Sequence, residues 1–303
     1  MPGVTAREPS RQPPILRFAP SPTGRLHLGH ALSALLNVDM ARALSGQLLV
    51  RIEDTDTQRC RPEHTTAILE DLEWLGVRSA GPILRQSEHL PVYAGAAGRL
   101  AAMGLLYPCF ATRQQIVEAA APGAVDPDGA PLYAKLQLRL PDAEVAERMS
   151  AGQPFAMRLD MAAAIARAAT ISGGAGITYT ELDGDLVPTQ VAIDPARWGD
   201  VVIQRKGHPA SYHLAVVVDD ARQGITHVVR GADLVAATDV HRLLQVLLGL
   251  PEPLYRHHRL IVDENGRKLA KRAGDTSLAS LRERGVTPAG IRRLVGIGET
   301  VQC

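Results

Sequence analysis

The sequence predicts an α/β fold in which a parallel sheet is interrupted by an inserted α+β subdomain and followed by a short helical C-terminal segment. Short apolar stretches alternate with helical patterns before residue 107 and again after residue 200. Between these positions, a loop rich in Ala, Gly, Pro and Asp precedes strand patterns joined by turn residues. We expect a disordered lead at 1–13, sheet halves at 14–106 and 201–252, an insertion at 107–200, and a loop with a short helical tail at 253–303.

Composition and charge limit the possible classes of protein. The chain has 303 residues, 46% of them hydrophobic, which is enough for a full core. A net charge of +1 gives no overall signal for nucleic-acid binding. The longest apolar runs, such as Leu214–Val218, are far too short to span a membrane, and Met1–Pro14 lacks the apolar region of a signal peptide. Three scattered cysteines are too few for a disulfide framework. We therefore expect a cytoplasmic protein with no membrane partner.

The first strand, loop and helix form the part of the chain most suited to holding a ligand. Ile15–Ala19 is apolar and strand-like, and Pro20–Arg25 is a loop with two prolines and a glycine. From Leu28, apolar residues recur at helical spacing, with His27 and His30 at the start of the helix. Free backbone N–H groups and the positive end of the helix dipole favour a phosphate there.

The rest of the first half continues the same alternation. Gln47–Ile52 is a second strand, which ends in an acidic cluster that starts at Glu53. A helix begins near Pro62, which suits the first helical turn. After a short extended piece at 82–86, Ser87 is a plausible N-cap for a helix that runs to about residue 103. Functional groups of a parallel sheet gather at the carboxyl ends of its strands, where Arg17, Ser21 and Glu53 lie.

The later elements follow from the same patterns. The insertion contains strand patterns that we expect to be antiparallel, at 155–159, 177–182 and 186–193, the last two joined by Asp183-Gly184. The α/β pattern then resumes with a strand at 201–204, a helix from Tyr212, a strand at 225–229 and a helix at 234–248. Two short helices are expected at 277–284 and 288–295.

Three motifs occur in a fixed order along the chain. His27-Leu28-Gly29-His30 follows a proline-rich loop, Arg51-Ile52-Glu53-Asp54-Thr55-Asp56 comes about twenty residues later, and Gly266-Arg267-Lys268-Leu269-Ala270-Lys271-Arg272 lies far downstream. An isolated HxGH is more often a capped helix with a surface histidine. The ordered set, however, resembles the class I aminoacyl-tRNA synthetases, and RFAPSPTG with RIEDTD narrows the resemblance to the glutamyl/glutaminyl branch. It implies a Rossmann-type sheet and covers residues 14–296.

The resemblance implies how ATP would be used. Catalytic roles fall on His27, His30 and Lys271, and ATP contacts on Pro20, Gly29 and Lys268 as well, with Mg²⁺ assisting. The chain has only four lysines against 29 arginines, yet two of the four lie in the downstream motif. Because an ammonium is a compact charge that can follow a moving phosphate, this choice suggests that the site requires lysine. Ala270 stands where the family usually has Ser.

The resemblance also implies an amino-acid pocket. L-glutamate carries two carboxylates and an ammonium, so it needs two cationic partners and one anionic partner. The matching positions are Arg17 and Arg230 for the carboxylates, Glu53 for the ammonium, and Ser21 and Tyr212 for hydroxyl contacts. Any one of these alone would more often be a solvated charge at a strand end. We interpret Asp54 and Asp56 as loop caps.

Within the branch, the chain resembles the glutamyl-queuosine tRNA(Asp) synthetases, because about thirty residues follow KLAKR and we expect no anticodon-binding domain. That family activates glutamate without tRNA and attaches it to the cyclopentenediol of queuosine in the anticodon stem-loop of tRNA(Asp). We expect a monomer. The alternatives are a truncated glutamyl-tRNA synthetase that charges a tRNA 3′ end, a non-catalytic RNA- or nucleotide-binding relative, and a small-molecule nucleotidyltransferase.

Two further expectations concern metal and RNA. Many family members bind zinc in the insertion through a Cys-x-Cys pair, a Tyr and another Cys. Here Ala111 follows Cys109 in place of the second Cys, and Tyr133 has no Cys near it. One thiol cannot form a tetrahedral structural site, so we predict no zinc and no other metal-ligating residues. Residues 256–272 are basic and adjoin the ATP motif; they could contact RNA or form an ordinary solvated face.

Overall fold

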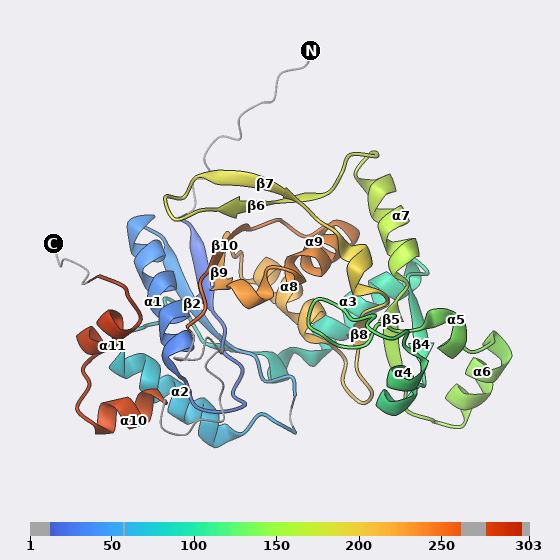
Figure 1. Cartoon of the computed structure of the whole chain (residues 1–303), viewed down its shortest axis with the longest axis horizontal. Helices are drawn as coiled ribbons and strands as arrows, with labels where there is room; N and C mark the ends of the chain where they lie inside the picture. Colours follow the sequence, from blue (N-terminus) through green and yellow to red (C-terminus); the bar gives the residue numbers. More distant parts are fainter. Residues whose placement is uncertain (1–12, 57, 262–276, 299–303) are drawn as a thin grey trace, which may run out of the picture.

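A seven-stranded, mostly parallel sheet forms the centre of the computed structural model, which describes residues 13–56, 58–261 and 277–298 (Figure 1). The strand order is β3-β2-β1-β9-β10-β6-β7, and only β6 and β7 pair antiparallel. The strands are β1 (Ile15–Phe18), β2 (Gln47–Ile52), β3 (Leu84–Arg85), β6 (Thr178–Leu182), β7 (Pro188–Ala192), β9 (His227–Gly231) and β10 (Leu254–His258). The predicted α/β class is thus confirmed.

Alternation along β1 shows that helices cover both faces of this sheet. Leu16 and Phe18 are buried among residues of one helical layer, whereas Arg17 contacts Asp220 in the other layer. The first layer comprises α1 (Leu28–Ala43), α2 (Pro62–Trp74), α10 (Leu278–Glu283) and α11 (Pro288–Leu294). The second comprises α8 (Tyr212–Arg222) and α9 (Ala237–Leu248), with α3 (Leu90–Ala102) packed against them. Figure 1 shows α10 and α11, in red, beside α1 and α2.

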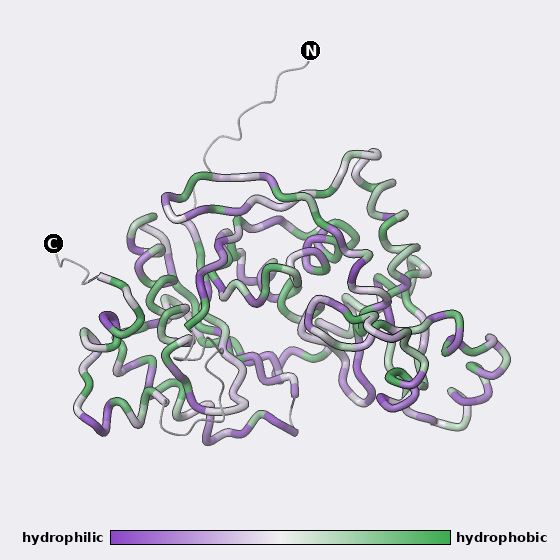
Figure 2. Tube along the Cα trace, viewed as in Figure 1, coloured by the Kyte–Doolittle hydropathy of each residue, from purple (hydrophilic) through white to green (hydrophobic). Residues whose placement is uncertain are grey.

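A small antiparallel sheet forms the centre of the insertion. Its order is β4-β5-β8, from β4 (Leu106–Cys109), β5 (Ala156–Leu159) and β8 (Val202–Gln204). The helices of this region are α4 (Arg113–Ala119), α5 (Lys135–Leu138), α6 (Asp142–Ser150) and α7 (Met161–Ile171). Figure 2 shows both hydrophilic and hydrophobic residues along α6, and none of them is buried. Short 3₁₀ turns complete the described elements at η1 (Gln86–His89), η2 (Pro195–Trp198) and η3 (Ala232–Leu234).

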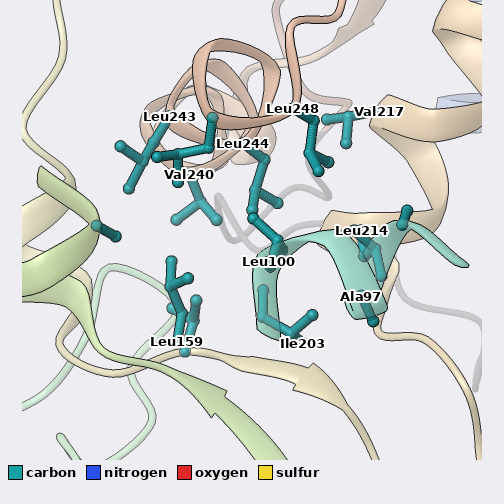
Figure 3. Close-up of a cluster of buried hydrophobic side chains, with 14 of the residues drawn as sticks. Ala97, Leu100, Leu159, Ile203, Leu214, Val217, Val240, Leu243, Leu244 and Leu248 are labelled. Atoms are coloured by element: carbon teal, nitrogen blue, oxygen red, sulfur yellow. The ribbon is translucent and has the colours of Figure 1, made fainter. Parts of the chain in front are cut away.

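One hydrophobic cluster connects the insertion sheet to the second helical layer (Figure 3). Leu159 of β5 and Ile203 of β8 are fully buried in it together with Leu100 of α3, Leu214 of α8 and Leu243 of α9. Because burying a leucine or isoleucine side chain contributes roughly 1.5–3 kcal/mol, this shared cluster is a large part of what fixes the small sheet on the central one.

Sheet membership differs from the sequence-based expectation in two places. The predicted hairpin at 177–193 does not lie in the insertion: β6 pairs with β10 in parallel and extends the central sheet. Conversely, the strand expected to resume the α/β pattern, β8, pairs with β5 in the small sheet. In each case the local pattern identified a strand, but the partner lies far away in the sequence and leaves no local signal. β10 was missed for a different reason: its sequence, LYRHH, has no apolar run or alternation that would predict a strand.

Helix starts show one further correction. Ser87 is not an N-cap: it lies inside η1, and α3 begins at Leu90. Its backbone N–H and hydroxyl instead donate to Asp54, at 2.8 Å each. Asp54 thus accepts from a residue 33 positions away rather than within its own loop, and it ties the loop after β2 to η1, just before α3. Among the described residues, no helix is both long and apolar enough to cross a bilayer.

Candidate active site

A pocket of about 680 Å³ opens at the carboxyl ends of β1 and β9. It is lined by every predicted site residue that the structure describes. These residues come from four separate stretches of the chain. These are Arg17, Pro20, Ser21, His27, Gly29, His30, Glu53, Tyr212 and Arg230. The other two, Lys268 and Lys271, lie outside the described residues.

His27 and His30 together cap the N-terminus of α1. Nδ1 of His27 accepts from the backbone N–H of Gly29 at 3.1 Å, and Nδ1 of His30 accepts from the backbone N–H of His27 at 3.2 Å. An imidazole whose Nδ1 accepts carries its proton on Nε2 when neutral. The capping arrangement thus sets both rings in the tautomer that presents an Nε2–H donor, the group needed to hold a phosphate oxygen.

Gly29 lies tightly against the ring of His27. A Cβ placed on Gly29 would lie 3.0 Å from Cε1 and 3.1 Å from Nδ1 of His27, closer than nearly all real Cβ contacts. The close neighbour that disfavours a side chain at position 29 is therefore the ring of His27, itself a predicted site residue.

The segment that carries Lys268 and Lys271 is flanked by described residues at this same pocket. Ile261, before the segment, lines the pocket. Ser277, after it, forms an isolated antiparallel bridge with His27, and the backbone N–H of Leu278 donates to the carbonyl of Leu26 at 2.9 Å.

A buried ion network lies beneath the predicted glutamate residues. Asp220 of α8 accepts from Nε of Arg17 at 3.1 Å and from Nη1 of Arg51 at 2.7 Å. Arg51 also donates from Nη2 to Glu53 at 3.1 Å, and its side chain is 0% exposed. The backbone N–H of Glu53 donates to the carbonyl of Pro20, which joins the ends of β1 and β2.

Sequence reasoning missed Arg51 and Asp220, although a signal was present. Arg51 interrupts the apolar run of β2, and Asp219 and Asp220 follow the apolar run of α8; buried charges at such positions require partners. Burial raises the pKa of Glu53 above its ordinary value, against the opposing effects of Arg51 and Arg17. The same two arginines hold the pKa of Asp220 low despite its burial.

Arg230 is held in a different way, by three uncharged groups. Its Nε donates to Nε2 of His257 at 3.1 Å, Nη1 to Nδ1 of His241 at 3.0 Å, and Nη2 to Oγ1 of Thr238 at 2.7 Å. These supporting residues were also not predicted. His257 lies on β10, which sequence reasoning did not find, and His241 is one of five polar or charged residues on α9, so its sequence does not single it out.

A second cavity, of about 640 Å³, adjoins the first and is shared between the core and the insertion. Ser21, Glu53 and Tyr212 line both cavities. Across the second one, Arg205 donates to Asp56 at 2.9 Å, which links the insertion to the loop after β2. Asp56 also accepts from the side chain of Arg59, three positions later, and so caps its own loop as well.

The residues at the position where the family resemblance would place a zinc ion do not fit that metal. Cys109 is buried with Tyr107 and Tyr133, and the neighbouring positions are filled by Ala111, Ile116 and Leu138. Tyr107 donates instead to Asp200 at 2.5 Å. The described part of the chain holds no group of three or more His, Cys, Asp or Glu placed to bind a metal ion.

Comparisons with known proteins agree with the motif resemblance. The family model described as tRNA synthetases class I (E and Q), catalytic domain, matches residues 15–298. The chain is 45% identical to a protein of Rhodobacter capsulatus named glutamyl-Q tRNA(Asp) synthetase, over 93% of this chain and 100% of the relative. It is 37% identical to glutamate–tRNA ligase 2 of Methylobacterium sp., over 95% of this chain but 62% of that one.

Comparison with a solved structure agrees with these sequence matches. Glutamate-tRNA synthetase from Elizabethkingia anophelis superposes with a TM-score of 0.75 at 28% identity, over 94% of this chain and 61% of that one. The chain therefore spans about three-fifths of the length of the glutamate–tRNA ligases it is compared with here.

Proposed function

The chain belongs to the class I tRNA synthetases of the glutamate and glutamine group, and we propose that it is an ATP-dependent ligase that activates L-glutamate without tRNA. We further propose that it transfers the glutamate to the cyclopentenediol of queuosine in the anticodon of tRNA(Asp). The finer part of this proposal is supported by the relative from Rhodobacter capsulatus, which matches along its full length.

The observation that carries the glutamate assignment is the distribution of charge around the pocket. Arg17 and Arg51 are balanced by Asp220 and Glu53, whereas Arg230 is 5% exposed and, among the described residues, has only uncharged hydrogen-bond partners. A buried cation without an anionic partner is costly, so the pocket favours a ligand that supplies a carboxylate. Glu53, in the same pocket, offers an anionic group for the ammonium of that ligand.

Activation follows from this geometry. The α-carboxylate of glutamate attacks the α-phosphate of ATP, glutamyl-adenylate forms and pyrophosphate leaves. The nucleophile is already ionised at neutral pH, so no general base is needed, and catalysis consists of positioning and charge stabilisation. The Nε2–H groups of His27 and His30 can donate to phosphate oxygens, and Mg²⁺ bound to the triphosphate would neutralise further charge. By their motif, Lys268 and Lys271 would complete the phosphate site.

Transfer requires an acceptor hydroxyl beside the adenylate. That hydroxyl attacks the acyl carbon, an ester forms and AMP leaves. The second cavity shares Ser21, Glu53 and Tyr212 with the first, so a nucleoside in it would lie next to the bound glutamyl group. We assign this cavity to the acceptor.

Glutamate-dependent ATP–pyrophosphate exchange in the absence of tRNA tests the activation step. We expect exchange by the wild type and at least about a 100-fold loss in Lys271→Ala, because one phosphate-binding charge is removed. Arg167→Ala, an exposed position on α7, is the matched control and should retain full activity. Absence of exchange with and without tRNA would refute the enzymatic assignment and favour a non-catalytic relative.

The acceptor is tested by mapping where radiolabelled glutamate is attached. After incubation with tRNA(Asp) that contains queuosine, ribonuclease digestion should place the label on the anticodon fragment. Label on the 3′-terminal adenosine, or exchange that needs tRNA, would instead support a truncated enzyme that charges the acceptor end. The similarity to glutamate–tRNA ligases makes this the second candidate.

A further inference from the structure

The partners of Arg230 fix the protonation of three buried histidines. An arginine can only donate, so Nδ1 of His241 and Nε2 of His257 must both be unprotonated acceptors. His241 then carries its proton on Nε2, from which it donates to Nδ1 of His213 at 3.2 Å. His257 carries its proton on Nδ1, from which it donates to Glu181 at 2.8 Å.

Each of these imidazoles is also held in its neutral form. Burial and the nearby charge of Arg230 lower the pKa of His213 to about 4 and hold that of His241 well below its ordinary value. Burial likewise lowers the pKa of His257, although Glu181 opposes this effect. The hydrogen bonds therefore connect Arg230 to the carboxylate of Glu181 through the neutral ring of His257 and not directly.

The consequence is a guanidinium that is rigidly oriented yet keeps its full charge. Three of its five N–H groups are occupied by Nε2 of His257, Nδ1 of His241 and Oγ1 of Thr238. Within the described part of the chain, no hydrogen bond engages the other two N–H groups, which can donate to a ligand. If position 241 held a carboxylate, the guanidinium would be equally well oriented but its charge would be neutralised, as it is for Arg17 beside Asp220.

We propose that His241 is a positioning residue that determines specificity: by supplying an uncharged acceptor to Arg230, it makes the pocket select a ligand carboxylate over the isosteric amide. This inference rests on the proposed function for the identity of the ligand, glutamate as against glutamine. The rings of His213 and Tyr212, 5.3 Å and 5.5 Å from that of His241, hold it from the side of α8.

Two isosteric substitutions separate charge from shape. His241→Asn and His241→Asp both place an oxygen near the former Nδ1, but only the second adds a negative charge. In ATP–pyrophosphate exchange we expect the Asn variant to keep the KM for glutamate within about 5-fold of the wild type. The Asp variant should raise it at least about 30-fold and reduce the preference for glutamate over glutamine by a similar factor. Equal effects of Asn and Asp on KM and preference would overturn the inference, since a merely structural role would not distinguish them.

The experiment stays decisive if the Asp variant does not fold, as judged by its thermal transition. His241→Leu removes the acceptor without adding charge, so relative to Asn it should raise the KM for glutamate about 10-fold at unchanged kcat. An unchanged KM in the Leu variant would then refute the positioning role.

Calorimetric titration with glutarate, a dicarboxylate without an ammonium group, separates this inference from the proposed function. Binding of glutarate that survives in His241→Asn and is lost in His241→Asp supports the inference even if glutamate is never activated. Wild-type protein that binds neither glutamate nor glutarate would refute both.

Discussion

Glu53 makes glutamate binding depend on pH in a defined direction. Its pKa is raised by burial, so it takes up a proton at a higher pH than an ordinary glutamate does. Because a ligand ammonium needs the ionised form, the KM for glutamate should rise as the pH falls through this raised pKa. Measured between pH 5 and 8, Glu53→Gln should bind weakly and lose this dependence. Asp54→Asn, in the same loop but engaged with Ser87, should keep it; loss of the dependence in both variants would implicate another group.

Asp71 should limit the stability of the molecule near neutral pH. It is 1% exposed, and neither carboxylate oxygen has a hydrogen-bond partner among the described residues; the nearest cation, Arg282, lies at 3.8 Å. Burial raises its pKa from 3.8 to about 6. The folded state thus holds this proton more tightly than the unfolded state, so stability is lost as the pH rises through 6.

Asp71→Asn removes the buried charge and should raise the free energy of unfolding by about 1–2 kcal/mol at pH 7.5. At pH 4.5 the carboxyl group is protonated in the folded state, so the gain should be much smaller. Urea unfolding at the two pH values measures the difference, with Glu73→Gln, exposed on the same helix, as control. A gain that does not change with pH would contradict the assignment.

At the scale of an element, the start of α1 combines two roles in one side chain. His27 caps the helix through Nδ1, and under the proposed function its Nε2–H donates to the ligand. His27→Asn should keep the cap, since Asn is among the best N-cap residues, but lose the donor. We expect exchange activity to fall about 100-fold with a nearly unchanged thermal transition. His27→Ala should also lose about 1 kcal/mol of stability; equal stability of the two variants would argue against the capping role.

Elements with a strong local pattern were predictable from the sequence, whereas their partners were not. The residue ranges of β2 and the starts of α1, α2 and α8 agree with their apolar periodicity and, for α2, with its N-terminal proline. The β6–β7 hairpin was recognised but assigned to the insertion, because its pairing with β10 depends on residues about seventy positions away. Likewise, motif residues of the pocket were found, but Asp220, His241 and His257 were not, since only the folded chain brings them to the arginines.

At the scale of the whole molecule, the C-terminal helices are part of the core. Leu278, Ile291 and Val295 are 0% exposed and share a cluster with residues of α1 and α2. Ile291→Ala should therefore cost about 2–4 kcal/mol in the free energy of unfolding. Leu294→Ala, an exposed neighbour, should cost less than about 1 kcal/mol. Similar losses in the free energy of unfolding for both variants would contradict a specific role of Ile291 in the core.

Removing metal ions with a chelator tests whether the insertion depends on a bound metal for its stability. Because Cys109 lies among apolar neighbours and Tyr107 donates to Asp200, we expect neither EDTA nor added zinc to shift the thermal transition. The measurement is a thermal scan with and without each reagent. A shift of more than about 4 °C with EDTA would indicate a structural metal.

The bridge between His27 and Ser277 also constrains the order in which the protein becomes active during synthesis. The turn that contains His27 leaves the ribosome first, and Ser277, which forms the bridge with it, follows about 250 residues later. At about 5–20 residues per second, the turn waits roughly 10–50 s for its partner. A nascent chain can therefore cap α1 with His27 and His30 long before Ser277 joins the backbone of His27, and under the proposed function nucleotide binding by the growing chain should appear only after Ser277 has been synthesised.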